Sequence, residues 1–223
     1  VMDNILYLYG AFDSINGIEA HSLAKYDGTS WGPVFNLPKF MSSLNRIYDA
    51  EWFEGELYIG GDFHKPGSNP PIHGLAKWNG FDWVGVDVGL FGTFPNVSAL
   101  ATYQGKLVIA GHFNKHDTPG SIPGNGITIW DGQVWDTLQG GVQYRVPGGW
   151  IRGILIHEDA LYAYGLFDSA GGYPARNLAM WDGNRWCGLE ESNDFVPTSI
   201  GFYHDTLFMT IGSESVGGID SIS

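Results

Sequence analysis

Histidine is the residue type in this sequence best suited to binding a metal, and it occurs in two close pairs. His112 and His116 lie in the stretch GHFNKH, and His64 and His73 flank one predicted loop. His112 falls on a predicted strand and His116 in a loop, so the pair lacks helical spacing, and no cysteine or third histidine completes either pair. We therefore expect no metal site and no cofactor.

Carboxylates offer a second kind of chemistry, in two recurring positions. The aspartates that precede a glycine, where they accept backbone hydrogen bonds in a tight turn, are Asp27, Asp131 and Asp182. Those beside a phenylalanine at a predicted strand end, where capping is favoured over a cation or sugar site, are Asp13, Asp62 and Asp168. A glycosidase needs two facing carboxylates, and the sequence does not show such a pair. We expect no catalytic residue and favour a non-enzymatic protein, with a glycosidase as an alternative.

Other catalytic motifs do not fit. The sialidase Asp-box places a residue between its aspartate and glycine, whereas Asp131 and Gly132 are adjacent. Cys187 has no histidine pair that would support a copper site, and it is the single cysteine, so an internal disulfide is excluded. The sequence contains neither a glycine-rich phosphate loop nor a serine nucleophile elbow.

Aromatic side chains near predicted long loops are the remaining candidates for a ligand site. Aromatics with polar neighbours suit sugar stacking or a protein contact. The alternative is that they cap the cores of the structural units. The candidate ligand-binding residues are Tyr144, Arg145, Trp150, Phe91, Phe94 and Tyr173.

Composition limits the class of partner. The formal net charge of −13 disfavours nucleic acids and anionic membranes. No apolar run approaches the roughly 20 residues of a membrane helix, so we expect no membrane insertion. Hydrophobic residues make up 43% of the 223-residue chain, which is enough for a packed core.

The elements that would position these residues repeat about every fifty residues. A strand-like marker recurs as LYLYGAF, LYIGGDF, LVIAGHF and LYAYGLF. The glycine two residues before its final phenylalanine is Gly10, Gly61, Gly111 or Gly165. A second marker recurs as LAKYDGTSW, LAKWNGFDW, ITIWDGQVW and LAMWDGNRW, ending at Trp31, Trp83, Trp135 and Trp186. A short apolar strand precedes the first marker in most copies.

Four short strands per repeat predict an all-β fold, a β-propeller of four-stranded antiparallel blades. The repeat units are about 3–53, 54–103, 104–157 and 158–203, with a partial unit over 204–223, all in a single domain. The first unit lacks its leading strand and the fifth loses the pattern at Ile211 and Ser213. Four recognisable units with partial ends cannot close cleanly into a ring. We therefore expect that blades are missing or that the chain is cut from a longer one.

The second marker predicts a hairpin between the third and fourth strands of each unit. Asp-Gly and Asn-Gly favour two-residue type I′ turns, at Asp27, Asn79, Asp131 and Asp182. With Asn79-Gly80 as the turn, Trp78 would face Phe81 and Ala76 would face Trp83. Each repeat would then place a small residue opposite its final tryptophan, so we interpret these tryptophans as structural.

Strand direction predicts two different faces. Turns between first and second strands are short, for example Glu54-Gly55 and Gln104-Gly105, as are those between third and fourth strands. The other connections are long and divergent, and they lie on the opposite face. They cover about 13–22, 64–73, 114–125 and 168–176 after second strands, and 36–45, 87–96, 139–149 and 190–197 after fourth strands. Divergent loops on a rigid scaffold are where function is expected.

These repeated motifs, LYIGGDF, GLAKWNGFDW and VSALATYQGKLVIAGHF, resemble the repeats of secreted bacterial β-propeller proteins, many of them exported by the type IX secretion system. They are similar, more distantly, to repeats in a fungal cortical polarity marker. The resemblance implies a secreted or cell-surface location but no catalytic residues. The sequence has no sorting domain. We expect a binding or adhesion module that contacts a protein or glycan at the cell surface, with a lectin-like or accessory propeller of a polysaccharide-degrading glycosidase as the alternative.

Overall fold

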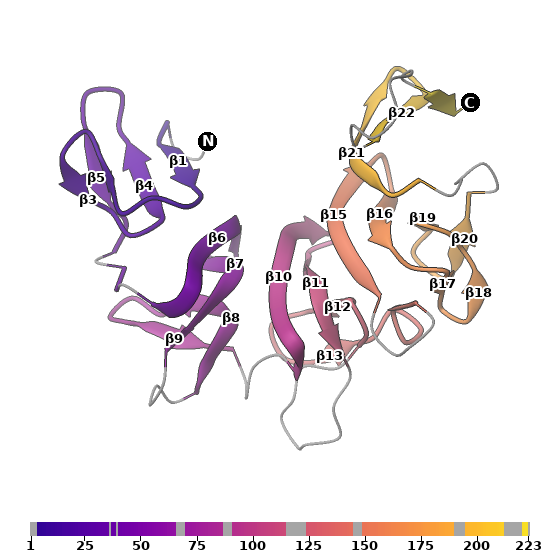
Figure 1. The fold of residues 1–223 in the computed structure, drawn as a ribbon, viewed down its shortest axis with the longest axis horizontal. Helices are drawn as coiled ribbons and strands as arrows, with labels where there is room; N and C mark the ends of the chain where they lie inside the picture. Colours follow the sequence, from indigo (N-terminus) through magenta and orange to yellow (C-terminus); the bar gives the residue numbers. More distant parts are fainter. Residues whose placement is uncertain are drawn as a thin grey trace.

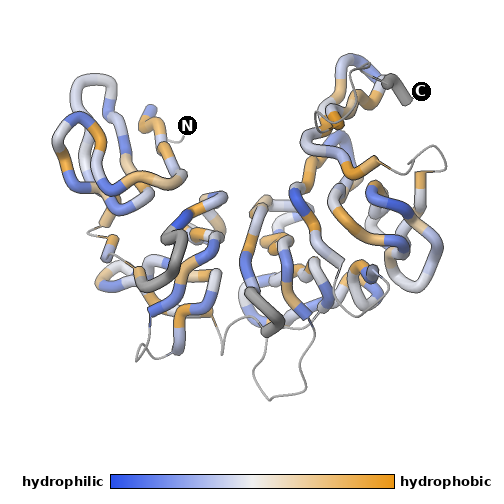
Figure 2. Tube along the Cα trace, viewed as in Figure 1, coloured by the Kyte–Doolittle hydropathy of each residue, from blue (hydrophilic) through white to orange (hydrophobic). Residues whose placement is uncertain are grey.

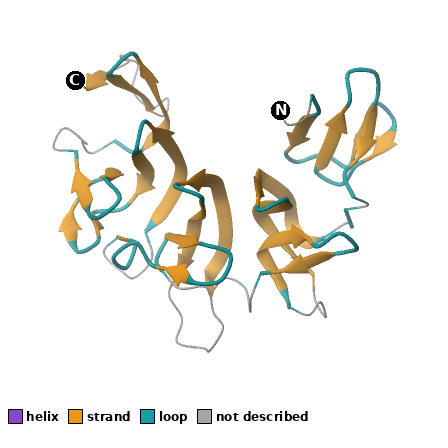
Figure 3. Ribbon diagram, turned by 180° about the vertical axis from the view of Figure 1, so that it is seen from behind, coloured by secondary structure: helices purple, strands orange, loops and turns teal. Residues whose placement is uncertain are grey.

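The computed structural model describes residues 4–35, 37–38, 40–65, 70–86, 91–114, 124–144, 149–189, 195–211 and 220–222. For 41–45, 91–94 and 220–222 it describes the backbone alone. These residues form strands and loops and include no helix (Figure 3), which confirms the predicted all-β class.

The strands form five consecutive units. The first contains β1 (Leu6–Tyr9), β2 (Ser14–Ile15), β3 (Ile18–Glu19), β4 (Leu23–Tyr26) and β5 (Trp31–Pro33). The second contains β6 (Met41–Phe53), β7 (Glu56–Lys65), β8 (Ile72–Trp78) and β9 (Trp83–Gly85). The third contains β10 (Phe91–Tyr103), β11 (Lys106–Asn114), β12 (Ile127–Trp130), β13 (Trp135–Asp136) and the short β14 (Val142–Gln143).

The last two units follow the same plan. The fourth contains β15 (Trp150–His157), β16 (Ala160–Leu166), β17 (Ser169–Ala170), β18 (Tyr173–Pro174), β19 (Leu178–Trp181) and β20 (Trp186–Gly188). The fifth contains β21 (Pro197–Tyr203), β22 (Thr206–Ile211) and β23 (Asp220–Ile222). In the second to fifth units the sheet therefore begins at the first strand, ahead of the second-strand marker, whereas the first unit begins at the marker strand β1 itself.

The main strands of a unit pair in chain order as an antiparallel meander, for example β6-β7-β8-β9. The third and fourth units join through one bridge between β11 and β15 into an eight-stranded sheet. The units follow one another along an open arc with the two termini at its ends, and β6, β10, β15 and β21 neighbour one another in turn (Figure 1). In the described part of the chain the arc does not close into a ring.

The core is divided into three clusters, each between two consecutive units. Alternate residues of one strand point to opposite clusters, because side chains on a strand alternate between its faces. Leu57 and Ile59 of β7 pack toward the first unit, whereas Tyr58 packs toward the third. Val108 and Ala110 of β11 pack toward the fourth unit. Hydrophobic stretches accordingly occur in every unit (Figure 2).

The turns between first and second strands match the prediction. Phe53 faces Glu56 and Tyr103 faces Lys106, which leaves loops of two residues. Both central residues of the Glu54-Gly55 loop have positive φ, at 51° and 79°. This is the type I′ geometry that suits the twist of a hairpin.

The predicted register of the hairpins between third and fourth strands is wrong. Trp78 faces Trp83, and Ala76 faces Gly85, so the loop has four residues instead of two. The other units agree, with Tyr26 facing Trp31, Trp130 facing Trp135 and Trp181 facing Trp186. Small residues therefore do not lie opposite the final tryptophans; an aromatic ring does.

The reason is that the aspartate or asparagine side chain organises the loop. Oδ1 of Asp131 accepts hydrogen bonds from the backbone N–H groups of Gln133 and Val134, at 2.9 and 2.6 Å. The backbone N–H of Asp131 donates to the Val134 carbonyl at 3.2 Å. Asn79, Asp27 and Asp182 make the same side-chain bonds to the two residues that lie two and three positions later.

Two predicted long loops are also shorter than expected. Strands β6 and β10 have 13 residues each and begin at Met41 and Phe91. Residues 41–45 and 91–96 of the segments predicted as loops over 36–45 and 87–96 are thus strand. The extra length is possible because the pairing with the second strand slips, between Met41 and Arg46 and between Phe91 and Asn96.

The recurring glycine has a specific role beside a β-bulge. In four units one extra residue of the first strand (Tyr48, Ser98, Arg152 or Thr198) interrupts the pairing at the same place. The marker glycine faces the residue before the bulge. A Cβ at Gly61, Gly111 or Gly165 would collide with a carbonyl oxygen of the first strand, that of Arg46, Asn96 or Trp150. Glycine therefore relieves a close approach in these three units, whereas in the fifth unit Ile211 faces Pro197 at the equivalent place.

We expect Gly165→Ala to destabilise the protein more than Gly10→Ala. The two glycines have nearly equal φ, 157° and 158°, so any backbone cost is shared. A Cβ at Gly10 meets nothing closer than the Phe12 ring, at 3.8 Å. The difference in free energy of unfolding should be about 1–3 kcal/mol, which is typical of overpacking. Urea unfolding measures it, and equal losses would contradict the steric account.

The aspartate loops predict a pH-dependent stability. The pKa values of Asp27, Asp131 and Asp182 are lowered, first by the backbone N–H groups they accept. A lowered folded-state pKa gives stability that is present above the ordinary value and lost as the pH falls through the folded value. Urea unfolding of the triple variant D27N/D131N/D182N, from neutral to about pH 3, should show a shallower decline. Asn79 shows that the amide keeps the loop, so a D27A/D131A/D182A control should be weaker at every pH. An unchanged acid decline in the asparagine variant would contradict the assignment.

Candidate functional site

Two backbone hydrogen bonds close the base of the long loop between the second and third strands in the third and fourth units. In the fourth unit Gly165 N–H donates to the Asn177 carbonyl, and Asn177 N–H donates to the Phe167 carbonyl, both at 3.0 Å. Gly111 and Gly126 form the equivalent pair with Phe113. Asn177 is 5% exposed and adopts a φ of 64°, so this closure fixes the base of the loop.

Two of these long loops fold into small hairpins of their own. Ser14–Ile15 pairs with Ile18–Glu19 across Asn16-Gly17, and Ser169–Ala170 pairs with Tyr173–Pro174 across Gly171-Gly172. All four turn residues have positive φ. The Asn-Gly and Gly-Gly pairs, flanked by apolar residues, are hairpin signals that the sequence analysis missed.

Loops of two different units build one three-stranded sheet on the long-loop face, the face that carries these connections. Strand β14, from the connection after the third unit, pairs with β17, which pairs with β18. Asp168 N–H donates to the Gln143 carbonyl at 2.8 Å, and Gly171 N–H donates to the Gly141 carbonyl at 2.9 Å. Val142 and Ala170 are fully buried beneath it. In this region the long-loop face is therefore formed by a hydrogen-bonded sheet.

Trp150 lies where the third and fourth units join. It is the first residue of β15 and pairs with Leu166 on one side and His112 on the other. Its indole lies 6.0 Å from the His112 ring, centroid to centroid, at an interplanar angle of 38°. The side chain is nonetheless 47% exposed. An aromatic ring fixed by backbone pairing on two sides and open to solvent can act as a stacking platform.

The structure places the other predicted ligand residues as follows. Tyr173 lies on the outer strand β18 and is 58% exposed, and Tyr144 follows β14 and is half-buried. Trp150, Tyr144 and Tyr173 thus lie on or next to segments of the same two units. Phe91 and Phe94 lie on β10, where only the backbone is described, and Arg145 lies outside the described residues.

Of the histidine pairs, one is brought together. His64 and His73 face each other across β7 and β8, with ring centroids 6.4 Å apart. The pKa of His73 is lowered by burial and then by the nearby His64. His112 meets Trp150, and His116 lies outside the described residues. Within the described ranges, no group of three or more His, Cys, Asp or Glu side chains could hold a metal ion.

The repeated tryptophans differ in burial according to their neighbours. Trp83 and Trp186 are 1% and 2% exposed, and each donates its indole N–H to a carbonyl of the preceding unit, Phe35 at 3.3 Å and Leu138 at 2.7 Å. Trp31, whose unit begins the chain, is only half-buried. Trp135 is half-buried as well.

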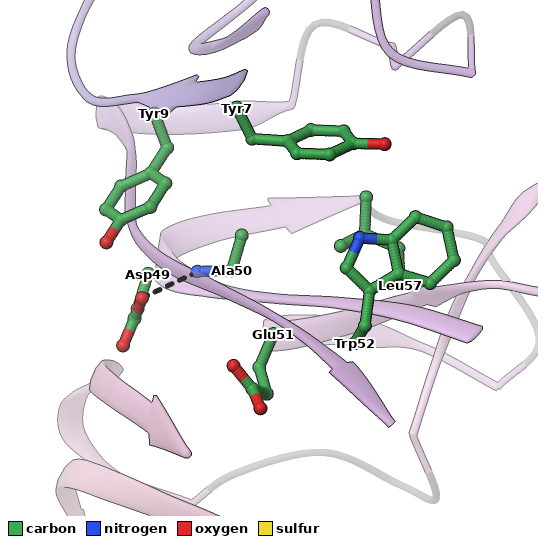
Figure 4. A pocket seen from close by; sticks show the side chains of 7 residues that line it. All are labelled: Tyr7, Tyr9, Asp49, Ala50, Glu51, Trp52 and Leu57. Carbon is green, nitrogen blue, oxygen red and sulfur yellow. Dashed lines mark hydrogen bonds between the residues drawn. The ribbon is translucent and has the colours of Figure 1, made fainter. Parts of the chain in front are cut away.

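A pocket that the sequence analysis missed lies between the first and second units. Its walls come from β1, β6 and β7, and the lining residues are Tyr7, Tyr9, Asp49, Ala50, Glu51, Trp52 and Leu57 (Figure 4). It encloses about 590 Å³. The available signal was the first copy of the marker, LYLYGAF, whose tyrosines no first strand among the described residues covers.

Asp49 is the most constrained group of this pocket. Oδ2 accepts the backbone N–H of Leu100 in the next unit, and Oδ1 accepts that of Ala50, both at 2.8 Å. Burial raises the pKa of Asp49, although the two backbone N–H groups and the nearby Tyr9 hydroxyl oppose the rise. Burial and the nearby Asp49 carboxylate raise the pKa of Tyr9 to about 12. The carboxylate therefore hydrogen-bonds to the next unit and lies near Tyr9 of the preceding one.

In the described part of the chain, no helix has the length and apolar character needed to cross a membrane. No protein-family model and no curated protein matches the sequence. Solved structures do match. One, the crystal structure of the computationally designed Ika8 protein, aligns with a TM-score of 0.52 and 12% sequence identity, over 95% of this chain and 54% of that chain. The chain thus spans about half the length of that protein, and at this identity the likeness shows the fold alone.

Trp186→Phe should destabilise the protein through its lost hydrogen bond. The change removes the indole N–H, but the Leu138 carbonyl keeps the bond from the Gly141 N–H at 3.3 Å, so the loss should be about 1 kcal/mol. Trp31→Phe is the control, because Trp31 is half-buried and belongs to the first unit. Denaturant unfolding should show a clearly smaller loss for Trp31→Phe. Similar losses for both variants would show that the hydrogen bond to the preceding unit contributes little.

Proposed function

We propose that this chain is a β-propeller binding module that acts outside the cell or at the cell surface, and that it contacts a protein or glycan through the long-loop face. The propeller assignment is supported by successive antiparallel meanders that pack face to face along an arc. The location is supported by the resemblance of the repeats to those of secreted propeller proteins.

The observation that carries the binding proposal is the pair of exposed aromatic residues on anchored strands. Trp150 and Tyr173 are 47% and 58% exposed. The strand of Trp150 pairs with β11 of the third unit, and that of Tyr173 pairs with β17, which in turn pairs with β14. Large aromatic side chains held in place lose little conformational entropy on binding, and they are enriched among the residues that dominate interfaces. The turns between strands on the other face are short and offer less surface.

A glycan is the second candidate ligand, and the exposed indole of Trp150 favours it. An aromatic ring offers a flat apolar surface to the apolar face of a sugar ring, and Tyr and Trp add a polar tip. The net charge of −13 makes a polyanionic ligand less suitable than a neutral one. No catalytic residue enters this proposal.

The test is to measure binding of the purified chain to a glycan array and to a panel of extracellular proteins. Trp150→Ala and Tyr173→Ala should each weaken the observed binding by roughly tenfold or more. Phe81→Ala is the control, since Phe81 is 93% exposed in a short turn between third and fourth strands. Thermal unfolding shows that each variant is folded.

The outcomes separate the candidates. Glycan binding that depends on Trp150 would support the lectin-like alternative, whereas protein binding with the same dependence would support an adhesion module. Binding that is lost in Phe81→Ala and kept in the other two variants would overturn the choice of face. An absence of binding on both panels would count against a binding module.

A further inference from the structure

Strand β1 has an open edge that the equivalent strands of the other units lack. The first sheet has the order β1-β4-β5, so β1 lies at its end. In the second unit the equivalent strand β7 lies between β6 and β8, and β22 of the fifth lies between β21 and β23. An edge strand presents unpaired backbone N–H and C=O groups that can pair with another strand.

The first unit also exposes side chains that are buried elsewhere. Leu6 and Leu8 of β1 are 42% and 40% exposed. The equivalent residues of β7, Leu57 and Ile59, are 1% and 0% exposed because they pack against the preceding unit. The apolar pattern of β1 is therefore that of a strand inside the array, although it lies at the end of it.

Gly10 points to the same conclusion. At its equivalents Gly61, Gly111 and Gly165 a first strand places a carbonyl oxygen where a Cβ would lie. Among the described residues no first strand pairs with β1, and a Cβ at Gly10 would have room. The first unit thus leaves room beside Gly10 for a strand that its own described residues do not supply.

The pocket occupies the place where such a strand would lie. In the second unit the first strand β6 pairs with β7 and neighbours β10 of the next unit. By the same arrangement, a first strand for the first unit would pair with β1 and neighbour β6. The pocket is lined by Tyr7 and Tyr9 of β1 and by residues 49–52 of β6, which lie on facing walls in Figure 4.

One donor in the pocket has no partner. Nε1 of Trp52 is inaccessible to solvent and makes no hydrogen bond. Its ring is held by edge-on contacts with Tyr7 and Phe35, each with centroids 6.2 Å apart. A buried donor without an acceptor is costly, and because Nε1 is closed off from solvent, a peptide carbonyl would reach it only with a turn of the indole toward the incoming strand.

We propose that the β1 edge and this pocket bind an extended peptide strand of the first-strand type found in this chain's own repeats. It would pair antiparallel with β1, as β6 does with β7, and place a carbonyl opposite Gly10. The row of neighbouring first strands β6, β10 and β15 would continue by one more member. This is strand addition to a sheet edge, in which backbone bonds give affinity and side-chain pockets give specificity. The site is separate from the long-loop face.

The test is a titration of the isotopically labelled chain with a synthetic peptide that copies residues 95–103, PNVSALATY. The expected result is a saturable shift of the Trp52 indole N–H resonance, together with slower hydrogen exchange of the β1 amides. A scrambled peptide should cause neither change. The absence of both effects with the first-strand peptide, or equal effects with the scrambled one, would overturn the proposal.

Two variants sharpen this test. Gly10→Ala should abolish peptide binding, because its Cβ would occupy the place of the incoming carbonyl. Gly32→Ala, in the same unit with a Cβ no nearer than 3.9 Å to Lys25, should bind as the unchanged chain does. Trp52→Phe keeps a ring but removes the donor, so its affinity should fall by roughly threefold to tenfold. Thermal unfolding shows that each variant is folded, and full binding by both Gly10→Ala and Trp52→Phe would contradict the proposed position.

Discussion

Burial between neighbouring sheets is the interaction on which the rest of this structure depends. Each second strand sends alternate side chains to two different cores, one shared with the unit before and one with the unit after. A sheet with two apolar faces is not stable alone in water, because both faces need cover. The units must therefore stack, and the repeat in the sequence follows from this requirement. Fully buried Ile59 and 40%-exposed Leu8 differ in what covers them, although their places in the repeat are the same.

The close approach of strands within a unit gives the second constraint. In the second, third and fourth units the bulged first strand brings a carbonyl oxygen against the second strand, at a place where a glycine leaves room for it. The Asx loops close the outer hairpins by capturing backbone amides, so the fourth strand starts directly with its tryptophan. With these features fixed, variation is concentrated in the long loops, and there two separate connections build the small sheet that carries Tyr173.

Much of this fold could be predicted from the sequence because it follows from periodicity. The second strands, the two-residue turns at Glu54-Gly55 and Gln104-Gly105 and the all-β class were all indicated by local pattern. The register at Asn79-Gly80 was not, because a type I′ turn and an Asx loop share the same residues and differ in which backbone groups the side chain captures. The β14–β17 pairing and the pocket at Asp49 depend on contacts between distant segments, which periodicity does not encode. The exposure of Leu6 and Leu8 could not be predicted from the marker either, because the burial of a strand depends on the units packed against it as well as on its own sequence.

Amide hydrogen exchange across the second strands tests this account most directly. The account predicts that amides of β7, β11 and β16, which are paired on both edges and covered on both faces, exchange most slowly. Strand β1 carries nearly the same sequence as β7 but has one open edge and exposed Leu6 and Leu8, so its amides should exchange much faster. Equally slow exchange in β1 and β7 would contradict the claim that stacking between neighbouring units is what stabilises each strand.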